Sequence, residues 1–233
     1  MKRNRVNIVT LGCSKNTVDS QKLMRQLQVG GYNVKGDSSD PSDVVIINTC
    51  GFIHDAKEES IDTIIRHAEA IKQQGRGHLF VMGCMVERYQ KELVNALPEV
   101  DAWFGVNKPG EIISRLGLAY HQELSGERVM TGLRHYAYLK ISEGCDRTCA
   151  FCAIPDIRGR YISTPVDELV AEAEFLASEG VKELILIAQD LTCYGTDLIG
   201  RQMLPLLVRR LSEVKGIEWI RLHYLYPSGF PLE

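Results

Sequence analysis

Short apolar runs alternate with longer amphipathic stretches in the first half of the chain. The runs at residues 6–11, 44–47, 79–82 and 102–104 predict strands, with a further short strand at 32–35. Between them, residues 18–27, 56–71 and 86–97 carry apolar positions three and four apart, which predicts helices. Residues 44–47 are apolar without alternation, as in a strand covered on both faces. This order predicts an α/β domain with a doubly wound parallel sheet, such as a flavodoxin-like one.

A second series of the same kind begins after residue 134. We expect strands at 136–141, 184–188 and 219–225, helices at 165–179 and 204–214, and an irregular loop at 142–162. Thr164 suits the N-cap of the first helix, Pro165 its first position, and Gly180 its end. These repeated units predict the first part of a β/α barrel.

The two series predict two domains, residues 1–120 and 135–233. Residues 121–134 lack periodicity and mix charges, so we expect a linker there. A closed eight-fold β/α barrel takes about 250 residues. Because three parallel strands cannot close a barrel, we expect the chain to be a truncated form of a longer protein.

Composition narrows the functional classes. With 233 residues, of which 45% are hydrophobic, the chain can bury a real core, which excludes disorder. The net charge of −3 gives no basic field, so direct nucleic-acid binding by this segment is not expected. The start lacks a signal-peptide core, and no apolar run approaches the roughly 20 residues that span a bilayer. We therefore predict a cytoplasmic protein without a membrane partner.

Seven cysteines, an odd number, favour metal or redox chemistry over a disulfide framework. Cys145, Cys149 and Cys152 form a C-x3-C-x2-C triad directly after a predicted strand. Three soft thiolates favour an iron-sulfur cluster or zinc, and the next cysteine is only Cys193. A cluster here would keep one iron open to an outside ligand. The alternative is a zinc site that takes its fourth ligand from a distant Cys or His.

Cys13, Cys50 and Cys84 are far apart in the sequence, but each comes one to three residues after a predicted parallel strand. Such strand ends share one edge of the sheet, so the three thiols could hold a second cluster. A glycine adjoins each of them, which suits tight turns and close backbone approach. The alternative is that each is a small buried apolar side chain. For the isolated Cys193 we expect no ligand role.

These cysteine patterns together resemble the radical S-adenosylmethionine methylthiotransferases over the whole chain. The similar segments are Thr10 to Ser20 around Cys13, Asn48 to Ile53 around Cys50, Met82-Gly83-Cys84, and the triad with Phe151. Residues 56–60, 97–101 and 135–140 resemble the branch that modifies a ribosomal protein. The transfer-RNA branch usually has Gln-Met-Asn after its first cysteine, whereas this chain has Ser14-Lys15-Asn16.

The resemblance implies a methylthiotransferase with two 4Fe-4S clusters and S-adenosylmethionine as cofactors. Cys145, Cys149 and Cys152 would hold the cluster that yields a 5′-deoxyadenosyl radical, and Cys13, Cys50 and Cys84 the cluster that carries the sulfur. Phe151, Gln189 and Asp190 are implied as S-adenosylmethionine contacts, with no catalytic residue beyond the cluster ligands. The implied substrate is the β-carbon of an aspartate in protein twelve of the small ribosomal subunit. Flavodoxin or ferredoxin would supply electrons.

Two alternative functions stay open at this point. One is the same chemistry on a modified adenosine of transfer RNA, and the other is an iron-sulfur or zinc module for electron transfer or scaffolding. The family continues through more barrel strands and a small β-barrel domain. Because these are missing here, we expect this segment alone to be inactive.

Overall fold

The computed structural model describes residues 4–227 and 229. The contacts between residues divide the chain into two compact units, Met1–Val129 and Met130–Glu233. Each unit has its own hydrophobic core. Among the described residues, no helix combines the length and the apolar character that crossing a membrane requires.

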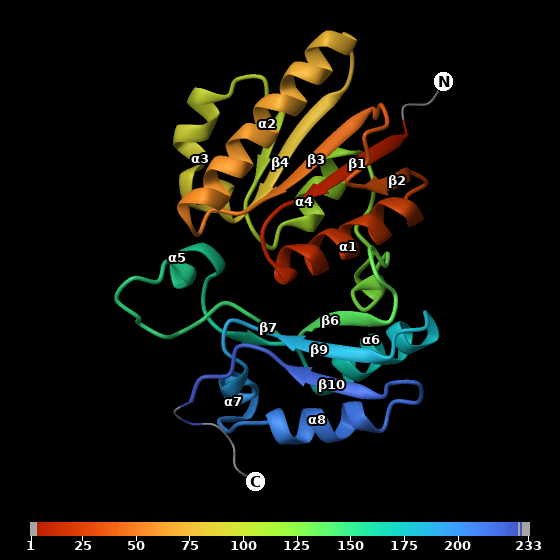
Figure 1. Ribbon diagram of the computed structural model, residues 1–233, viewed down its shortest axis with the longest axis vertical. Helices are drawn as coiled ribbons and strands as arrows, with labels where there is room; N and C mark the ends of the chain where they lie inside the picture. The colour runs from red at the N-terminus through yellow and green to blue at the C-terminus, as the bar shows by residue number, and fades with distance from the viewer. Residues whose placement is uncertain (1–3, 228, 230–233) are drawn as a thin grey trace. The chain divides into compact units, whose positions relative to one another are not determined.

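The first unit contains a five-stranded sheet in the order β2-β1-β3-β4-β5 (Figure 1). The strands are β1 (Arg5–Thr10), β2 (Asn33–Gly36), β3 (Val44–Thr49), β4 (His78–Gly83) and β5 (Ala102–Phe104). All neighbouring pairs are parallel. The expected doubly wound sheet is confirmed, and its strand order is that of flavodoxin-like folds.

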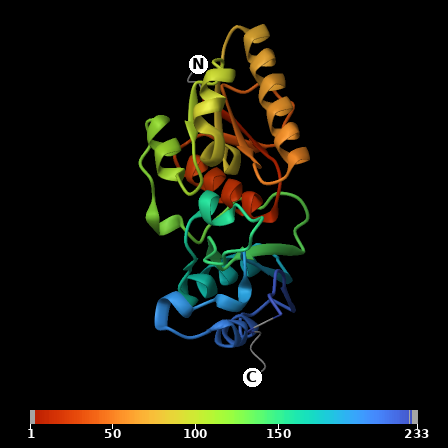
Figure 2. The ribbon, with the colours of Figure 1, turned by 90° about the vertical axis from the view of Figure 1, so that its left-hand side faces the viewer.

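Helices cover both faces of this sheet, as the unbroken apolar run of β3 predicted. One face packs against α1 (Ser14–Val29) and α4 (Pro109–Arg115). The opposite face packs against α2 (His54–Gln74) and α3 (Cys84–Ala96). Figure 2 shows α2 and α4 on opposite sides of the strands. The sequence pattern missed α4, because two turns of helix are too short to show a period.

Part of the expected linker packs on the first unit. The Gln26 side chain both donates to the His121 carbonyl, at 2.7 Å, and accepts from the His121 amide, at 3.0 Å. Arg25 and Glu127 form an ion pair at 2.7 Å. A short 3-10 helix, Gln122–Leu124, lies between these two contacts. Residues 121–127 therefore have fixed partners on α1.

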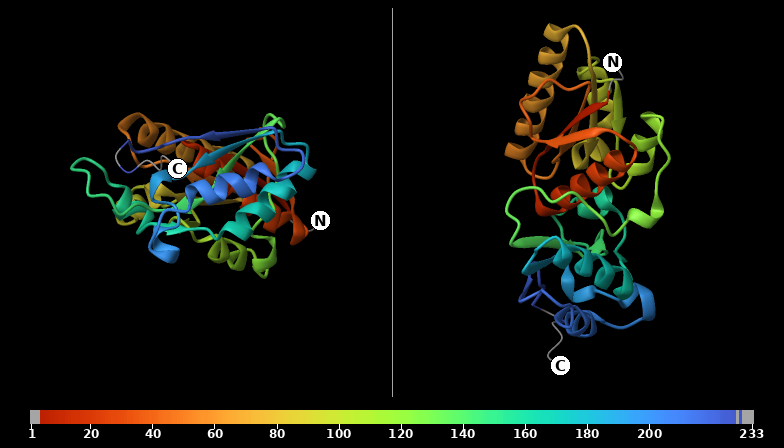
Figure 3. Two further views of the ribbon diagram at one scale, coloured as in Figure 1. Left: turned by 90° about the horizontal axis from the view of Figure 1, so that it is seen from below. Right: turned by 90° about the vertical axis from the view of Figure 1, so that its right-hand side faces the viewer.

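The second unit contains a three-stranded parallel sheet in the order β10-β9-β6. Its strands are β6 (Tyr136–Lys140), β9 (Glu183–Ile187) and β10 (Trp219–Leu222). One face buries its apolar side chains against α6 (Val166–Ser178) and α8 (Leu204–Ser212), which lie on the same side of β9 and β10 in Figure 3. The expected β/α units are confirmed, although β10 ends at Leu222 rather than at Leu225.

The region expected to be an irregular loop contains short elements. A two-stranded antiparallel sheet joins β7 (Ser142–Glu143) to β8 (Ile162–Ser163), with α5 (Ile154–Arg158) between them. The 3-10 helix Leu191–Cys193 and α7 (Thr196–Ile199) follow β9. These elements are too short for periodicity to reveal.

The expected capping by Thr164 is wrong. Pro165 occupies the N-cap position of α6, and no side chain caps the helix. The Thr164 amide instead donates to the Ile141 carbonyl at 2.9 Å, and its own carbonyl accepts from the Tyr194 hydroxyl at 2.7 Å. Thr164 therefore ties the helix entry to the end of β6.

Candidate functional site

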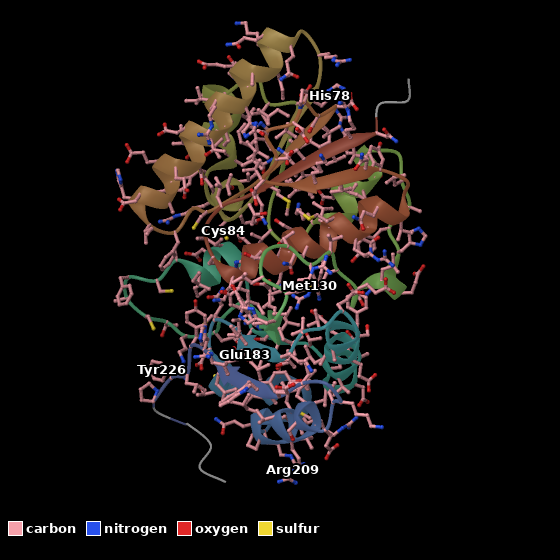
Figure 4. The ribbon with its side chains drawn as sticks, turned by 45° about the vertical axis from the view of Figure 1, so that its right-hand side comes forward. His78, Cys84, Met130, Glu183, Arg209 and Tyr226 are labelled. Carbon is pink, nitrogen blue, oxygen red and sulfur yellow. The ribbon has the colours of Figure 1, made fainter. Side chains whose placement is uncertain are left out.

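Three cysteines lie at the carboxyl ends of strands in the first unit. Cys50 directly follows β3, Cys84 directly follows β4, and Cys13 comes three residues after β1. The strands pair with Thr10 opposite Asn48 and Thr49 opposite Gly83, so their ends are aligned. Figure 4 labels Cys84 and His78, which mark the two ends of β4. The fold therefore brings all three cysteines to one edge.

Two glycines show how closely the three cysteine loops approach. A Cβ atom on Gly12 would lie 2.7 Å from Cys50 Cβ and 3.1 Å from Cys50 Sγ, and Gly12 has a φ of +86°. A Cβ on Gly51 would lie 2.6 Å from Met85 Cα and 3.0 Å from the Cys84 carbonyl carbon. The loop before Cys13 thus contacts Cys50, and the residue after Cys50 contacts the backbone at Cys84.

Buried polar side chains fix these loops. The side-chain amide of Asn16 donates to the carbonyls of Leu11 at 2.8 Å and Thr49 at 3.1 Å. The side-chain amide of Asn48 donates to the backbone carbonyl of Asn16 at 3.1 Å and to the Ser20 hydroxyl at 3.0 Å. Both asparagines are 1% exposed. Because a buried amide left unpaired is costly, these bonds hold the loops in one arrangement.

The three thiols differ in their accessibility. Cys84 is buried, and Cys13 and Cys50 are half-buried. Among the described residues, no group of three His, Cys, Asp or Glu side chains gathers closely enough to hold a metal ion. A 4Fe-4S cluster takes one thiolate at each of three irons, and three thiols are the donors at this edge. The Ser14 hydroxyl, beside Cys13, is buried without a hydrogen-bond partner, which suits a donor waiting for a cluster sulfur.

We expect Gly51→Ala to disrupt this edge without unfolding the unit. The added methyl would overlap the backbone at Met85, and backbone there can move only by separating the Cys50 and Cys84 loops. A cluster at this edge should be bound at least about tenfold more weakly in the variant, since 1.4 kcal/mol of strain lowers a binding constant by that factor. The measurement is iron content after anaerobic reconstitution. Gly110→Ala, in the same unit, is the control and should keep its iron, because an added Cβ there would lie 4.0 Å from its nearest neighbour, Tyr120 Cγ, which is ordinary contact.

A pocket of about 290 Å³ lies in the second unit, at the carboxyl ends of its parallel strands. Its lining comes from the loop after β6, the residues after β9 and the residues after β10: Cys145, Arg147, Cys149, Cys152, Ile154, Gln189, Asp190, Tyr224, Leu225 and Tyr226. The triad is thus gathered around one hollow. Cys145 is buried, Cys152 half-buried and Cys149 exposed.

Two local features shape the cysteine loop. Gly144 has a φ of +72°, and a Cβ there would overlap the carbonyl oxygens of Gly159 and Arg160, so only glycine fits. The Cys145 amide donates to the Gly159 carbonyl at 3.1 Å, and the Cys152 amide donates to the Cys149 carbonyl at 3.0 Å. The first bond closes the base of the loop, and the second forms a turn that brings the last two cysteines together.

The structure brings Gln189 and Asp190 into this pocket and leaves Phe151 out of its described lining. Phe151 is 89% exposed. The Asp190 carboxylate accepts from the Thr192 amide at 2.9 Å and from Arg147 Nε at 2.5 Å. Burial acts to raise the pKa of Asp190, but hydrogen bonds from the Thr192 hydroxyl, from Arg147 and from the Thr192 amide outweigh it and hold the pKa below its usual value. Asp190 is therefore a fixed anion at the pocket wall.

The sequence reasoning missed Arg147, which lies between the first two cysteines. Its guanidinium carbon lies 3.7 Å from the centroid of the Tyr226 ring, and Figure 4 labels Tyr226 on the segment after β10. The sequence feature that could have indicated it is an arginine within the cysteine loop.

Cys193 lies outside the pocket lining, with its Sγ 3.4 Å from Asp190 Oδ2. Burial raises the pKa of the Cys193 thiol, and the Asp190 charge adds to this, which disfavours a thiolate there.

A buried group of charged side chains lies at the start of the cysteine loop. Glu143 pairs with Lys140 at 2.8 Å and with Arg158 at 2.9 Å, and the Arg158 side chain is only 2% exposed. Burial acts to raise the pKa of Glu143, but the charges of Lys140 and Arg158 outweigh it and lower the pKa to about 2. Because Glu143 directly precedes Gly144, this group anchors the start of the cysteine loop.

We expect Glu143→Gln to destabilise the second unit by about 3 kcal/mol at pH 7, because it removes the carboxylate that pairs with the buried Arg158 charge. The folded pKa is lowered, so the contribution of this carboxylate is present above pH 4.5 and disappears as the pH falls toward 2. Urea unfolding at pH 7 and pH 3 measures it, and the gap between wild type and variant should narrow at pH 3. Glu218→Gln, which breaks an exposed pair with Lys182, should cost under about 1 kcal/mol. Equal losses for both variants would contradict the buried role.

Comparison with protein families gives a match for each unit. Residues 5–105 match the family described as "Uncharacterized protein family UPF0004". Residues 139–232 match the Radical SAM superfamily. The first match covers the sheet edge with Cys13, Cys50 and Cys84, and the second covers the pocket with the triad.

Several curated relatives are similar over the whole chain. The ribosomal protein uS12 methylthiotransferase RimO of Bacteroides fragilis is 55% identical over 234 aligned residues, covering 100% of this chain and 54% of the relative. The RimO proteins of Porphyromonas gingivalis and Cytophaga hutchinsonii are 53% and 52% identical, over 100% and 99% of this chain and 54% and 53% of the relatives. The chain therefore spans about half the length of the curated relatives it matches.

Solved structures share the fold at low sequence identity. The radical S-adenosylmethionine methyltransferase TsrM of Kitasatospora setae, with cobalamin and a [4Fe-4S] cluster bound, has a TM-score of 0.61 at 15% identity. The match covers 99% of this chain and 57% of TsrM. The cobalamin-dependent radical enzyme OxsB gives a TM-score of 0.58 at 14% identity, covering 95% and 38%. Each unit thus matches a family model, and more than half of the aligned residues are identical to those of the RimO of Bacteroides fragilis, so the chain is similar to this methylthiotransferase along its whole length.

Proposed function

We propose that this chain is the cluster-binding part of a methylthiotransferase that modifies an aspartate of ribosomal protein uS12 at its β-carbon. The observation that carries the proposal is the presence of two separate cysteine trios, each at the carboxyl edge of its own parallel sheet. Similarity to RimO proteins along the whole chain supports this choice of substrate. The proposed domains are 1–120 and 135–233, with 121–134 as the connection.

Cys145, Cys149 and Cys152 are the proposed ligands of a 4Fe-4S cluster in the pocket of the second unit. Among the lining residues that the structure describes, no fourth Cys and no His is present, and Asp190 is already held by Arg147 and Thr192. The donor set thus suits a cluster with one open iron and does not suit a closed four-ligand zinc site. Gln189 and Asp190 would orient S-adenosylmethionine from the wall of the pocket.

Cys13, Cys50 and Cys84 are the proposed ligands of a second 4Fe-4S cluster. The buried or half-buried thiols, the glycines that admit close approach and the unpaired Ser14 hydroxyl all suit a bulky inorganic group. When bound, the two clusters and S-adenosylmethionine together supply the radical that removes hydrogen from an unactivated carbon and the sulfur that replaces it. Asn16 and Asn48 hold the loops of the first unit in the positions that a cluster there would need. Glu143 anchors the cysteine loop of the second unit.

The test uses the whole protein, reconstituted under anaerobic conditions with an electron donor such as flavodoxin or ferredoxin. A uS12 peptide with its aspartate should gain a methylthio group, detected by mass spectrometry, together with 5′-deoxyadenosine. Transfer RNA is offered in parallel. Modification of transfer RNA instead of the peptide would overturn the substrate, and a cluster EPR signal that does not respond to S-adenosylmethionine would overturn the enzyme class in favour of an electron-transfer or scaffold module.

A further inference from the structure

The pocket of the second unit contains a positively charged side chain that the proposed cofactor binding does not use. Among its described lining residues, Arg147 is the only lysine or arginine, and Asp190 is the only acid. The Arg147 side chain is 31% exposed, whereas that of Asp190 is 4% exposed. Arg147 therefore presents charge to the hollow, while Asp190 stands behind it in the wall.

Contacts on two sides hold this guanidinium in place. Its Nε donates to Asp190 Oδ2 at 2.5 Å, and its carbon lies 3.7 Å from the centroid of the Tyr226 ring. Asp190 is itself fixed by Thr192. A guanidinium bonded at Nε and stacked on an aromatic ring has a defined plane, so little side-chain entropy remains to be lost when it binds a ligand.

A planar, fixed guanidinium is suited to a carboxylate. Arginine presents five N–H donors in a fork that matches the two oxygens of a carboxylate. The Nε bond to Asp190 and the contact of Nη2 with Cys193 Sγ at 3.9 Å use two of them, which leaves three for a ligand. A carboxylate that enters a pocket of about 290 Å³ loses much of its water, so it needs such a partner to bind. The side chain of aspartate carries its carboxylate directly on the β-carbon.

We propose that Arg147 binds the side-chain carboxylate of the substrate aspartate and so presents its β-carbon to the pocket. This rests on the proposed function, because it assumes an aspartate substrate. Arg147 is then a specificity-determining residue, and Asp190 and Tyr226 are positioning residues that act through it. The site should prefer aspartate over asparagine, which has the same shape without the charge.

The test compares binding of two uS12 peptides, one with the natural aspartate and one with asparagine, to the whole cluster-loaded protein by calorimetry. Wild type should bind the aspartate peptide about 10- to 100-fold more tightly, as expected for charge-assisted hydrogen bonds. Arg147→Met should abolish this preference. Arg147→Lys keeps a positive charge beside Asp190 but loses the forked N–H donors, so it should reduce the preference for the aspartate peptide. This variant replaces Arg147→Met in the comparison if the methionine variant does not fold. Arg160→Met, on the same loop but exposed, should keep the preference.

Kinetics separate this role from cofactor binding. In Arg147→Met the KM for the aspartate peptide should rise, whereas the KM for S-adenosylmethionine, measured by 5′-deoxyadenosine release, should change less than about twofold. A rise in the KM for S-adenosylmethionine with the aspartate preference intact would mean that Arg147 binds the cofactor carboxylate, and would overturn the inference. If wild type modifies the aspartate peptide but Arg147→Lys and Arg147→Met keep the full preference, only this inference fails. If wild type does not modify the peptide at all, the proposed function fails.

Discussion

Replacing Cys149 by alanine should abolish S-adenosylmethionine cleavage completely. Cys149 is the exposed member of the triad, so its loss leaves no buried cavity and should not disturb the core of the second unit. Two thiolates cannot hold three corners of a cluster. The expected result is a folded protein whose iron content falls by about four per chain, from about eight, and which releases no 5′-deoxyadenosine.

The matched control is Cys193→Ala, in the same unit. The Cys193 thiol lies outside the described pocket lining and next to Asp190, so this variant should keep its iron and should still release 5′-deoxyadenosine. Loss of iron in Cys193→Ala as well would show that Cys193 is a fourth ligand. The account of an open iron would then be wrong.

The triple replacement of Cys13, Cys50 and Cys84 by alanine should separate the two halves of the reaction. Iron should fall from about eight to about four per chain, because one 4Fe-4S cluster is lost and the other is kept. Cleavage of S-adenosylmethionine should continue, since the pocket belongs to a different compact unit. The peptide should gain no methylthio group.

Iron counting, product analysis by mass spectrometry and circular dichroism of the variant check this result. Cys84 is 6% exposed, so the circular dichroism spectrum establishes that the first unit still folds. About four irons in wild type, unchanged in the triple variant, would refute the second cluster. The three cysteines would then be small buried side chains at the sheet edge.

The parallel sheet and the position of the cysteines followed from local patterns. The unbroken apolar run that became β3 required cover on both faces, and α1 and α2 lie on those two faces. Parallel strands place their carboxyl ends together, so knowing where β1, β3 and β4 end was enough to bring Cys13, Cys50 and Cys84 to one edge. This inference needs only the spacing of apolar residues, which repeats every two residues in a strand and every 3.6 in a helix and can be seen directly in the sequence.

Pairings between distant residues could not be inferred in the same way. Arg147 meets Asp190 and Tyr226 only because the loops after β6, β9 and β10 converge, and no local pattern encodes that convergence. Thr164 had the chemistry of a cap, but its backbone was already used by Ile141 and Tyr194. Tertiary contacts overrode the local preference there.

The six proposed ligands lie outside the three hydrophobic clusters that form the cores of the two units. Burial of those apolar side chains, and not metal coordination, supplies the driving force for folding. Small zinc fingers behave in the opposite way, since their folding free energy is metal-binding free energy. Chelation or exposure to air should therefore yield an intact apoprotein, and a maturation system would receive a finished scaffold rather than an unfolded polypeptide.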